Sequence, residues 1–174
     1  EPAYLRAIIP PLTGAQVGLV TRPYRGGATT PFPALCESFL INSLFSPLVI
    51  VASQVEKTTY AFGATMAVKR CCVEAIGGFP TIANYLADDY YLGHLVSKAG
   101  YEARIVPHVV ETNPGVDSFR ELFHHQLRWA RTQRNCRPTG HCGTLVTFGT
   151  VWAVIGWLLY SGSPLIELLS WSTL

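Results

Sequence analysis

Short apolar runs separated by turns rich in glycine and proline make up the first part of the chain. Residues 17–21 (VGLVT) form a continuous apolar run, which predicts a buried strand. Residues 58–69 are rich in β-prone side chains and predict a second strand, broken at Gly63-Ala64. A glycine within a strand marks either a bulge in the core or a position where a ligand or another backbone comes close, and both interpretations remain open.

Between these strands the pattern changes from turn to helix. Residues 22–33 are rich in Gly, Pro and Thr and predict a loop. Residues 34–45 predict a helix that is interrupted at Pro47. The apolar residues 48–52 that follow are too few to cross a bilayer as a helix.

A helical stripe of apolar residues precedes Gly100 and predicts a helix that begins at Asp88 and Asp89. Carboxylates at a helix start complement the helix dipole, an effect worth about 0.5–2 kcal/mol. The dipole would also keep a carboxylate ionised there as a general base, so capping and catalysis both fit. Residues 101–112 then predict one or two strands broken near Pro107. Strand, helix and strand in this order predict the α/β fold class.

Residues 117–136 carry the densest group of polar and aromatic side chains, and Ser118 with Glu121 predicts a helix start. A 3.6-residue period places a core-like face opposite a polar one. The first face contains Phe119, Leu122, Phe123, Gln126, Leu127 and Ala130, and the other side contains His125, Arg128, Trp129 and Thr132. Arg offers a fork of donors to phosphate oxygens and Trp an apolar wall, which suits a nucleotide or phosphorylated ligand. A surface helix with solvated arginines fits the same pattern.

The last part of the chain is different in character. Residues 143–163 contain no charged side chain, and residues 145–160 are almost wholly apolar, which predicts a transmembrane helix. Four arginines between residues 128 and 137 lie just before it and place this side in the cytosol. With a second apolar segment from residue 165, residues 141–174 are predicted to be a truncated membrane-associated helical segment. A buried helix of a soluble core is the alternative.

Composition narrows the possible partners. A net charge of +2 gives no argument for a nucleic-acid partner, and none is predicted. Five cysteines in an irregular spacing argue against a disulfide framework. Cys136, His141 and Cys142 lack the fourth ligand and the usual spacing of a zinc site. We therefore predict no metal-binding residues in this chain.

Several segments together resemble one family. Asp88-Asp89-Tyr90, followed by residues 125–129 (HQLRW) and an apolar helix, is similar to the ceramide glucosyltransferase family, glycosyltransferase family 21. Its bacterial members associated with hopanoid biosynthesis resemble the chain most. The segments VGLVTRPYRGG and FGATMAVKR are similar to family segments as well.

This resemblance implies the C-terminal part of a GT-A (nucleotide-diphospho-sugar transferase, Rossmann-like) fold in residues 1–140, the acceptor half, followed by a transmembrane helix. Asp89 would be the catalytic general base, with Asp88 in the acidic position before it. His125 stands where the family usually has Gln or Arg. The substrate-binding residues that the resemblance implies are His125, Gln126, Arg128, Trp129, Gly63, Ala64 and Thr65.

The implied function is a membrane-bound inverting glycosyltransferase, catalytic on the cytosolic face. It would move a sugar from a UDP-sugar to the hydroxyl of ceramide or a hopanoid-like lipid. The family holds a divalent metal, Mg²⁺ or Mn²⁺, with a DxD motif that these residues lack, so the isolated chain is expected to be inactive. Two alternatives remain: a processive polysaccharide synthase, and a non-catalytic membrane-anchored scaffold, which the missing DxD favours.

Overall fold

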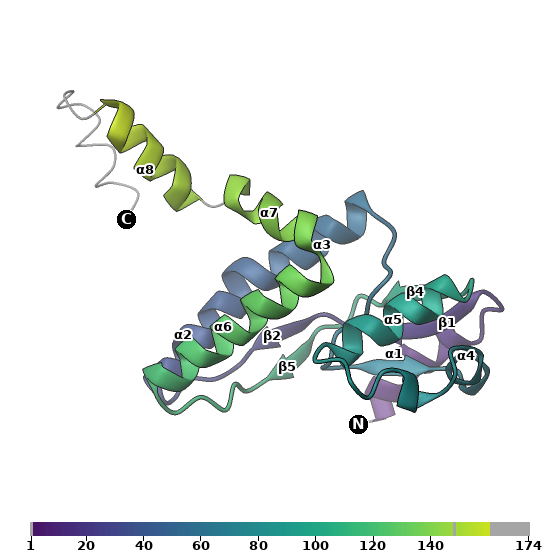
Figure 1. Ribbon diagram of the computed structural model, residues 1–174. Coiled ribbons are helices and arrows are strands. Elements are labelled where there is room, and N and C mark those ends of the chain that lie inside the picture. The colour runs from purple at the N-terminus through teal and green to yellow at the C-terminus, as the bar shows by residue number, and fades with distance from the viewer. Residues whose placement is uncertain (1, 148, 161–174) are drawn as a thin grey trace. The chain divides into compact units, whose positions relative to one another are not determined.

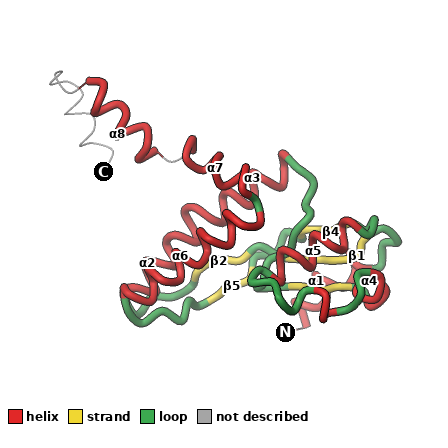
Figure 2. The backbone as a smooth tube through the Cα atoms, viewed as in Figure 1, coloured by secondary structure: helices red, strands yellow, loops and turns green. Residues whose placement is uncertain are grey.

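A computed structural model describes residues 2–147 and 149–160 of the chain. It divides into two compact units, Glu1–Leu127 and Arg128–Leu174, and each is described here by itself. The first unit combines two small sheets with several helices, as Figures 1 and 2 show. The predicted α/β class is therefore confirmed.

The central strand of the three-stranded sheet is β1 (Val17–Thr21). It pairs in antiparallel fashion with β3 (Met66–Val68) and in parallel with β4 (Glu102–Ile105). All five residues of β1 are buried, which confirms the strand predicted from its apolar run. A strand that has a neighbouring strand on each edge and helices on each face is shielded from water. Its side chains therefore need not alternate between apolar and polar residues.

The second sheet consists of β2 (Tyr24–Gly26) and β5 (Val110–Thr112), which run in parallel. The predicted break near Pro107 is confirmed, because it separates β4 from β5. The prediction of a loop over residues 22–33 is wrong in part, since β2 lies inside it. Its partner strand comes from a distant part of the chain, and local composition does not reveal such pairing.

Helices cover both faces of the central sheet. They are α1 (Pro2–Leu12), α4 (Arg70–Ala75), the 3₁₀ turn η2 (Phe79–Thr81) and α5 (Asp88–Lys98). Leu19 packs into one apolar cluster with residues of α4 and α5, whereas Val20 packs into another with Ile8 of α1. Successive strand residues point to opposite faces, so β1 supplies both halves of the core.

One continuous helix of 24 residues is built from α2 (Phe32–Leu40), the π-helical η1 (Ile41–Phe45) and α3 (Ser46–Val55). The predicted interruption at Pro47 is therefore wrong. A proline ring clashes with the carbonyl four residues earlier in a regular α-helix, and the wider π-helical turn before it relieves that clash. Ser46 Oγ also donates a hydrogen bond to Ile41 O, 3.0 Å away.

Helix α6 (Phe119–Cys136) begins as its sequence predicted. Glu121 N donates to Ser118 Oγ at 3.2 Å, and Glu121 Oε2 accepts from Asp117 N at 2.9 Å. The predicted core face is wrong in part, because Phe119 and Phe123 are 59% and 64% exposed. Leu122, Gln126 and Leu127 of that face are half-buried, and so is His125, which was predicted to lie on the other side.

The second unit contains the rest of α6, α7 (Pro138–Thr147) and α8 (Gly149–Tyr160). The residues predicted to form a transmembrane helix, 145–160, lie in α7 and α8 except for residue 148, which is outside the described residues. That helix therefore stays a prediction. Among the described residues, the helix long and apolar enough to cross a membrane is Phe32–Val55, with a mean hydropathy of 1.8. The predicted second apolar segment, from residue 165, lies outside the described residues.

Candidate active site

Asp89 lies in the first turn of α5, with both of its carboxylate oxygens hydrogen bonded. Its Oδ2 accepts from Gly63 N at 3.0 Å, and its Oδ1 accepts from Tyr90 N at 2.7 Å. Asp88 Oδ1 accepts from Asp89 N at 2.9 Å. The two aspartates therefore accept the free amides of Asp89 and Tyr90 at the start of the helix. Asp89 also accepts the amide of Gly63, which belongs to another segment.

The segment that Asp89 contacts is a tight turn between Phe62 and Thr65. Thr21, fully buried at the end of β1, holds both ends of this turn through its hydroxyl. That oxygen accepts from Phe62 N at 2.8 Å and donates to Thr65 O at 2.8 Å. Gly63 and Ala64 are exposed at its tip, whereas Thr65 is buried. The strand predicted over residues 58–69 is therefore limited to β3, and Gly63 lies in the turn before it. A Cβ at Gly63 would meet Asp89 Oδ2 at 3.4 Å, which is an ordinary contact distance.

Helix α5 reaches the segment before this turn because Gly93 has no side chain. A Cβ at Gly93 would lie 2.4 Å from the carbonyl carbon of Tyr60, a distance that real Cβ atoms do not show. The helix can therefore pack directly on the backbone of residues 60 and 61. This packing brings the N-terminal turn of α5 beside Gly63.

Burial raises the pKa of the Asp89 carboxyl above its usual range, and the neighbouring charge of Asp88 adds to the effect. The amides of Tyr90 and Gly63 act in the opposite direction. We predicted from sequence that the helix dipole would hold this carboxylate ionised, but burial has the larger effect. A carboxylate with a raised pKa is a stronger base, which suits proton abstraction near neutral pH.

A row of aromatic rings lies next to Asp89. The ring centroids of Phe45 and Phe62 are 5.6 Å apart, those of Phe62 and Tyr60 5.5 Å, and those of Tyr60 and Tyr90 6.4 Å. Tyr24 stacks against Phe45 at 4.7 Å. The rings come from four separate segments with no shared motif, so sequence patterns did not find them.

The Tyr24 hydroxyl is electrostatically linked to this site. Burial raises the pKa of Tyr24, and the negative charges of Asp89 and Glu37 raise it further. The phenol therefore keeps its proton at neutral pH and can act as a hydrogen-bond donor.

Glu37 is a buried carboxylate that the sequence reasoning missed. It is fully buried on α2, and its Oε1 lies 2.5 Å from His125 Nδ1 on α6. This contact turns His125 toward the protein interior, away from the polar side of α6 on which the sequence had placed it. The sequence could have indicated a buried, paired carboxylate here, because Glu37 is the only charged residue in the apolar helix Phe32–Val55.

Comparison with known families was decisive for the class of protein. Residues 1–173 match the family described as Glycosyl transferase family 21. The chain belongs to glycosyl transferase family 21. The resemblance to ceramide glucosyltransferases is thereby confirmed, and membership implies a GT-A fold. No solved structure matches the chain.

The residues of α6 that match the family motif differ in burial and in the unit to which they belong. Gln126 is half-buried, and its Nε2 has no hydrogen-bond partner among the described residues. Arg128 is exposed and Trp129 half-buried, and both belong to the second unit. That Arg128 and Trp129 share a pocket with Asp89 therefore stays a prediction.

The metal expected for a GT-A transferase does not fit the residues described here. Three of the four carboxylate oxygens of Asp88 and Asp89 already accept a backbone N–H group. No group of three His, Cys, Asp or Glu side chains gathers among the described residues. We therefore derive no step of the reaction through a metal at this site.

Proposed function

We propose that this family 21 chain forms the acceptor half of a membrane-bound inverting glycosyltransferase. It would transfer a sugar from a UDP-sugar to the hydroxyl of a lipid such as ceramide or a hopanoid, on the cytosolic face of the membrane. The observation that carries the proposal is the Asp89 carboxylate, held by the Gly63 and Tyr90 amides beside a row of aromatic rings.

In this reaction Asp89 removes the proton from the acceptor hydroxyl. The acceptor oxygen forms a bond to the anomeric carbon while the bond from that carbon to the diphosphate oxygen breaks. UDP leaves with the electron pair, and attack from the opposite face inverts the anomeric centre. The raised pKa of Asp89 supports this role, because a stronger base takes the proton more readily.

Other residues would bind and orient the substrates. Arg128 suits the diphosphate, since its guanidinium is a bidentate donor that keeps its charge. Trp129 would shape the pocket wall, and the turn formed by Gly63, Ala64 and Thr65 would line it. His125 and Gln126 would contact the substrate as well, with His125 Nδ1 held beside Glu37 Oε1.

The test uses the full-length protein in membranes and measures UDP release. UDP-glucose and UDP-N-acetylglucosamine would be the donors, with ceramide and a hopanoid as acceptors. Asp89→Asn should abolish lipid-dependent release, whereas Asp117→Asn, an exposed aspartate elsewhere, should leave it unchanged. Equal release from the wild type and Asp89→Asn would exclude Asp89 as the base.

The same assay separates the alternatives. A polymeric product would identify a processive polysaccharide synthase. A complete lack of release with every donor and lipid would favour the non-catalytic scaffold.

A further inference from the structure

The helix formed by α2, η1 and α3 exposes apolar side chains and buries its charged one, the opposite of a surface helix in a soluble protein. Its exposed side carries large apolar side chains, and its single charged residue, Glu37, is fully buried. The outward residues, all more than 40% exposed, include Phe32, Phe39, Leu44, Leu48, Val51 and Val55. We call these six residues the apolar face. Soluble proteins rarely leave so long a contiguous apolar surface in contact with water.

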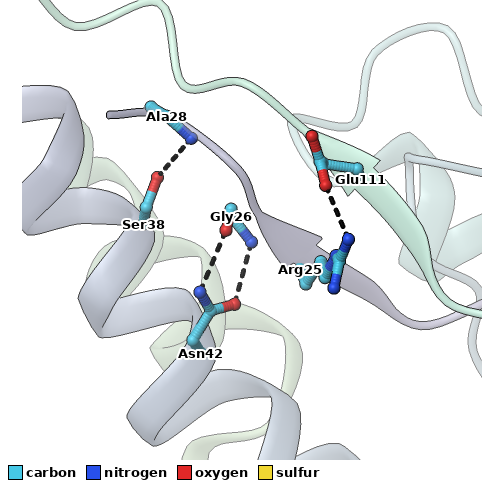
Figure 3. Close-up of polar contacts among 6 residues, drawn as sticks. All are labelled: Arg25, Gly26, Ala28, Ser38, Asn42 and Glu111. Carbon is cyan, nitrogen blue, oxygen red and sulfur yellow. Dashed lines mark hydrogen bonds and ion pairs between the residues drawn. The ribbon is translucent and has the colours of Figure 1, made fainter. Parts of the chain in front are cut away.

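Apart from the exposed Gln54, the neutral polar side chains of this helix make hydrogen bonds within the protein. Asn42 exchanges two hydrogen bonds of 2.9 Å with the backbone of Gly26, and Ser38 Oγ accepts from Ala28 N, as Figure 3 shows. Ser43 and Ser53 donate to carbonyls of their own helix at 2.7 Å. A helix whose hydroxyls and amide are bonded internally can lie against hydrocarbon without losing hydrogen bonds.

The start of α6 extends this surface. Phe119 and Phe123 are exposed, and the ring of Phe119 meets the ring of Phe32 edge-on at 6.0 Å. Arg120 and His124 are exposed as well, but so are the acidic Asp117 and Glu121, so this end of the helix carries no excess of positive charge. The two phenylalanine rings therefore provide its contact with lipid.

We propose that the apolar face, together with Phe119 and Phe123, is a membrane-binding surface that lies in the interfacial layer of a lipid bilayer. The helix lies along the membrane because its other side is bonded to β2. Crossing the bilayer would carry β2 and the exposed Arg25–Glu111 ion pair into hydrocarbon, which is unfavourable.

A protein partner fits this surface less well than lipid. Protein interfaces combine an apolar centre with a polar rim that supplies about one hydrogen bond per 100–200 Å². Here the Asn42 and Ser43 side chains are already bonded within the unit, and no charged residue of the helix is exposed. Dispersion and hydrophobic contact remain, and acyl chains provide both.

This surface would also bring a lipid acceptor close to the proposed base. The row of rings begins at Phe45, on the same helix, and continues through Phe62 and Tyr60 to Tyr90, beside Asp89. This last step rests on the proposed transfer reaction. Membrane binding itself does not, because it is measured without a sugar donor.

Photolabelling tests the surface directly. The full-length protein would be placed in vesicles of phosphatidylcholine and phosphatidylglycerol that contain a phospholipid with a diazirine on its acyl chain. After illumination, mass spectrometry should find lipid attached to peptides from Phe32–Val55 and from the start of α6. Lipid attached only to other segments would overturn the proposal, as would cover of this face by a second copy or by the second unit.

Substitution provides an independent measurement. The double change Phe39→Asp and Val51→Asp should weaken binding to these vesicles at least about tenfold, because two large apolar contacts with the bilayer are lost. A matched pair of exposed apolar positions elsewhere, Phe79→Asp and Val109→Asp, should leave binding unchanged. Equal binding by both double variants would contradict the assignment, whatever the outcome of the transfer assay.

Discussion

At the scale of single residues, Asp89 shows how opposing effects set the properties of one carboxyl group. Burial raises its pKa, and the backbone amides of Gly63 and Tyr90 lower it. The same amides fix the direction of the carboxylate, so the group is held in place while its basicity is increased. The structure thus places at this position a base that is oriented before a substrate arrives.

The raised pKa predicts a pH-dependent effect of Asp89→Asn on stability. A pKa that is higher in the folded state means that Asp89 stabilises the fold at acid pH, and that this contribution is lost as the pH rises through the folded-state pKa. The substitution removes a carboxylate that is unfavourable when ionised. Thermal melts should therefore show the melting temperature of Asp89→Asn, relative to the wild type, increasing from acid to neutral pH.

A difference between the two melting temperatures that stays constant with pH would show that Asp89 does not have a raised pKa in the folded protein. Asp117→Asn is the control, because it removes an exposed carboxyl group outside this site.

At the scale of elements, one buried pair joins α2 to α6. Glu37 Oε1 lies 2.5 Å from His125 Nδ1, and His125 lies at the proposed binding region of α6. Removal of one member leaves a buried polar group without its partner, whereas removal of both leaves an apolar contact. The pair therefore fixes the rotation of α6 more than it increases stability.

A double-mutant cycle measures this coupling. Glu37→Leu and His125→Leu should each reduce the free energy of unfolding by about 2–4 kcal/mol, because each removes the contact between the two side chains. The double variant should lose less than the sum, with a coupling of about 1–3 kcal/mol in chemical denaturation. Strict additivity would show that the two side chains do not interact.

The close approach of α5 to the backbone of Tyr60 gives a second prediction at this scale. Gly93→Ala places a Cβ where backbone atoms lie, so the helix must move, at a cost of about 1–3 kcal/mol. The movement would draw Asp89 away from Gly63 and reduce transfer activity as well. Denaturation and UDP release measure the two effects.

Gly140 in α7 supplies the matched control, because a Cβ there meets no atom closer than 3.6 Å. Gly140→Ala should stabilise the protein by up to about 1 kcal/mol, since alanine favours the helix over glycine. If Gly93→Ala behaved in the same way, the tight packing of α5 would be disproved.

At the scale of the whole molecule, the first unit is organised around β1. This strand is hydrogen bonded on both edges and contributes side chains to both apolar clusters. Its last residue, Thr21, also holds the turn that contacts Asp89. The core and the candidate site therefore share one element, and loss of the core should remove the site too.

Hydrogen exchange should reveal this organisation. The amides of Leu19, Val20 and Thr21 are expected to exchange only on global unfolding, orders of magnitude more slowly than those of the largely exposed residues 83–86. The measurement is mass spectrometry or NMR at a fixed pH. Comparable rates in both segments would show that β1 is not the centre of a cooperative unit.

Local chemistry was sufficient for several features of this protein. The apolar run of β1, the start of α6 at Ser118 and the start of α5 at Asp88 follow from burial and capping rules that act over a few residues. The family followed from short motifs spread over the chain. In each case the deciding contacts lie within one segment, so the sequence alone contains them.

The tertiary structure decided the rest, because the deciding contacts join distant segments. Helix α3 continues past Pro47 through a π-helical turn, His125 turns inward to meet Glu37, and Phe119 turns outward. The pKa of Asp89 is raised because folding buries it, against the effect of its own helix. Burial and pairing at long range outweigh local propensity at these positions, since each joins groups that no short stretch of sequence brings together.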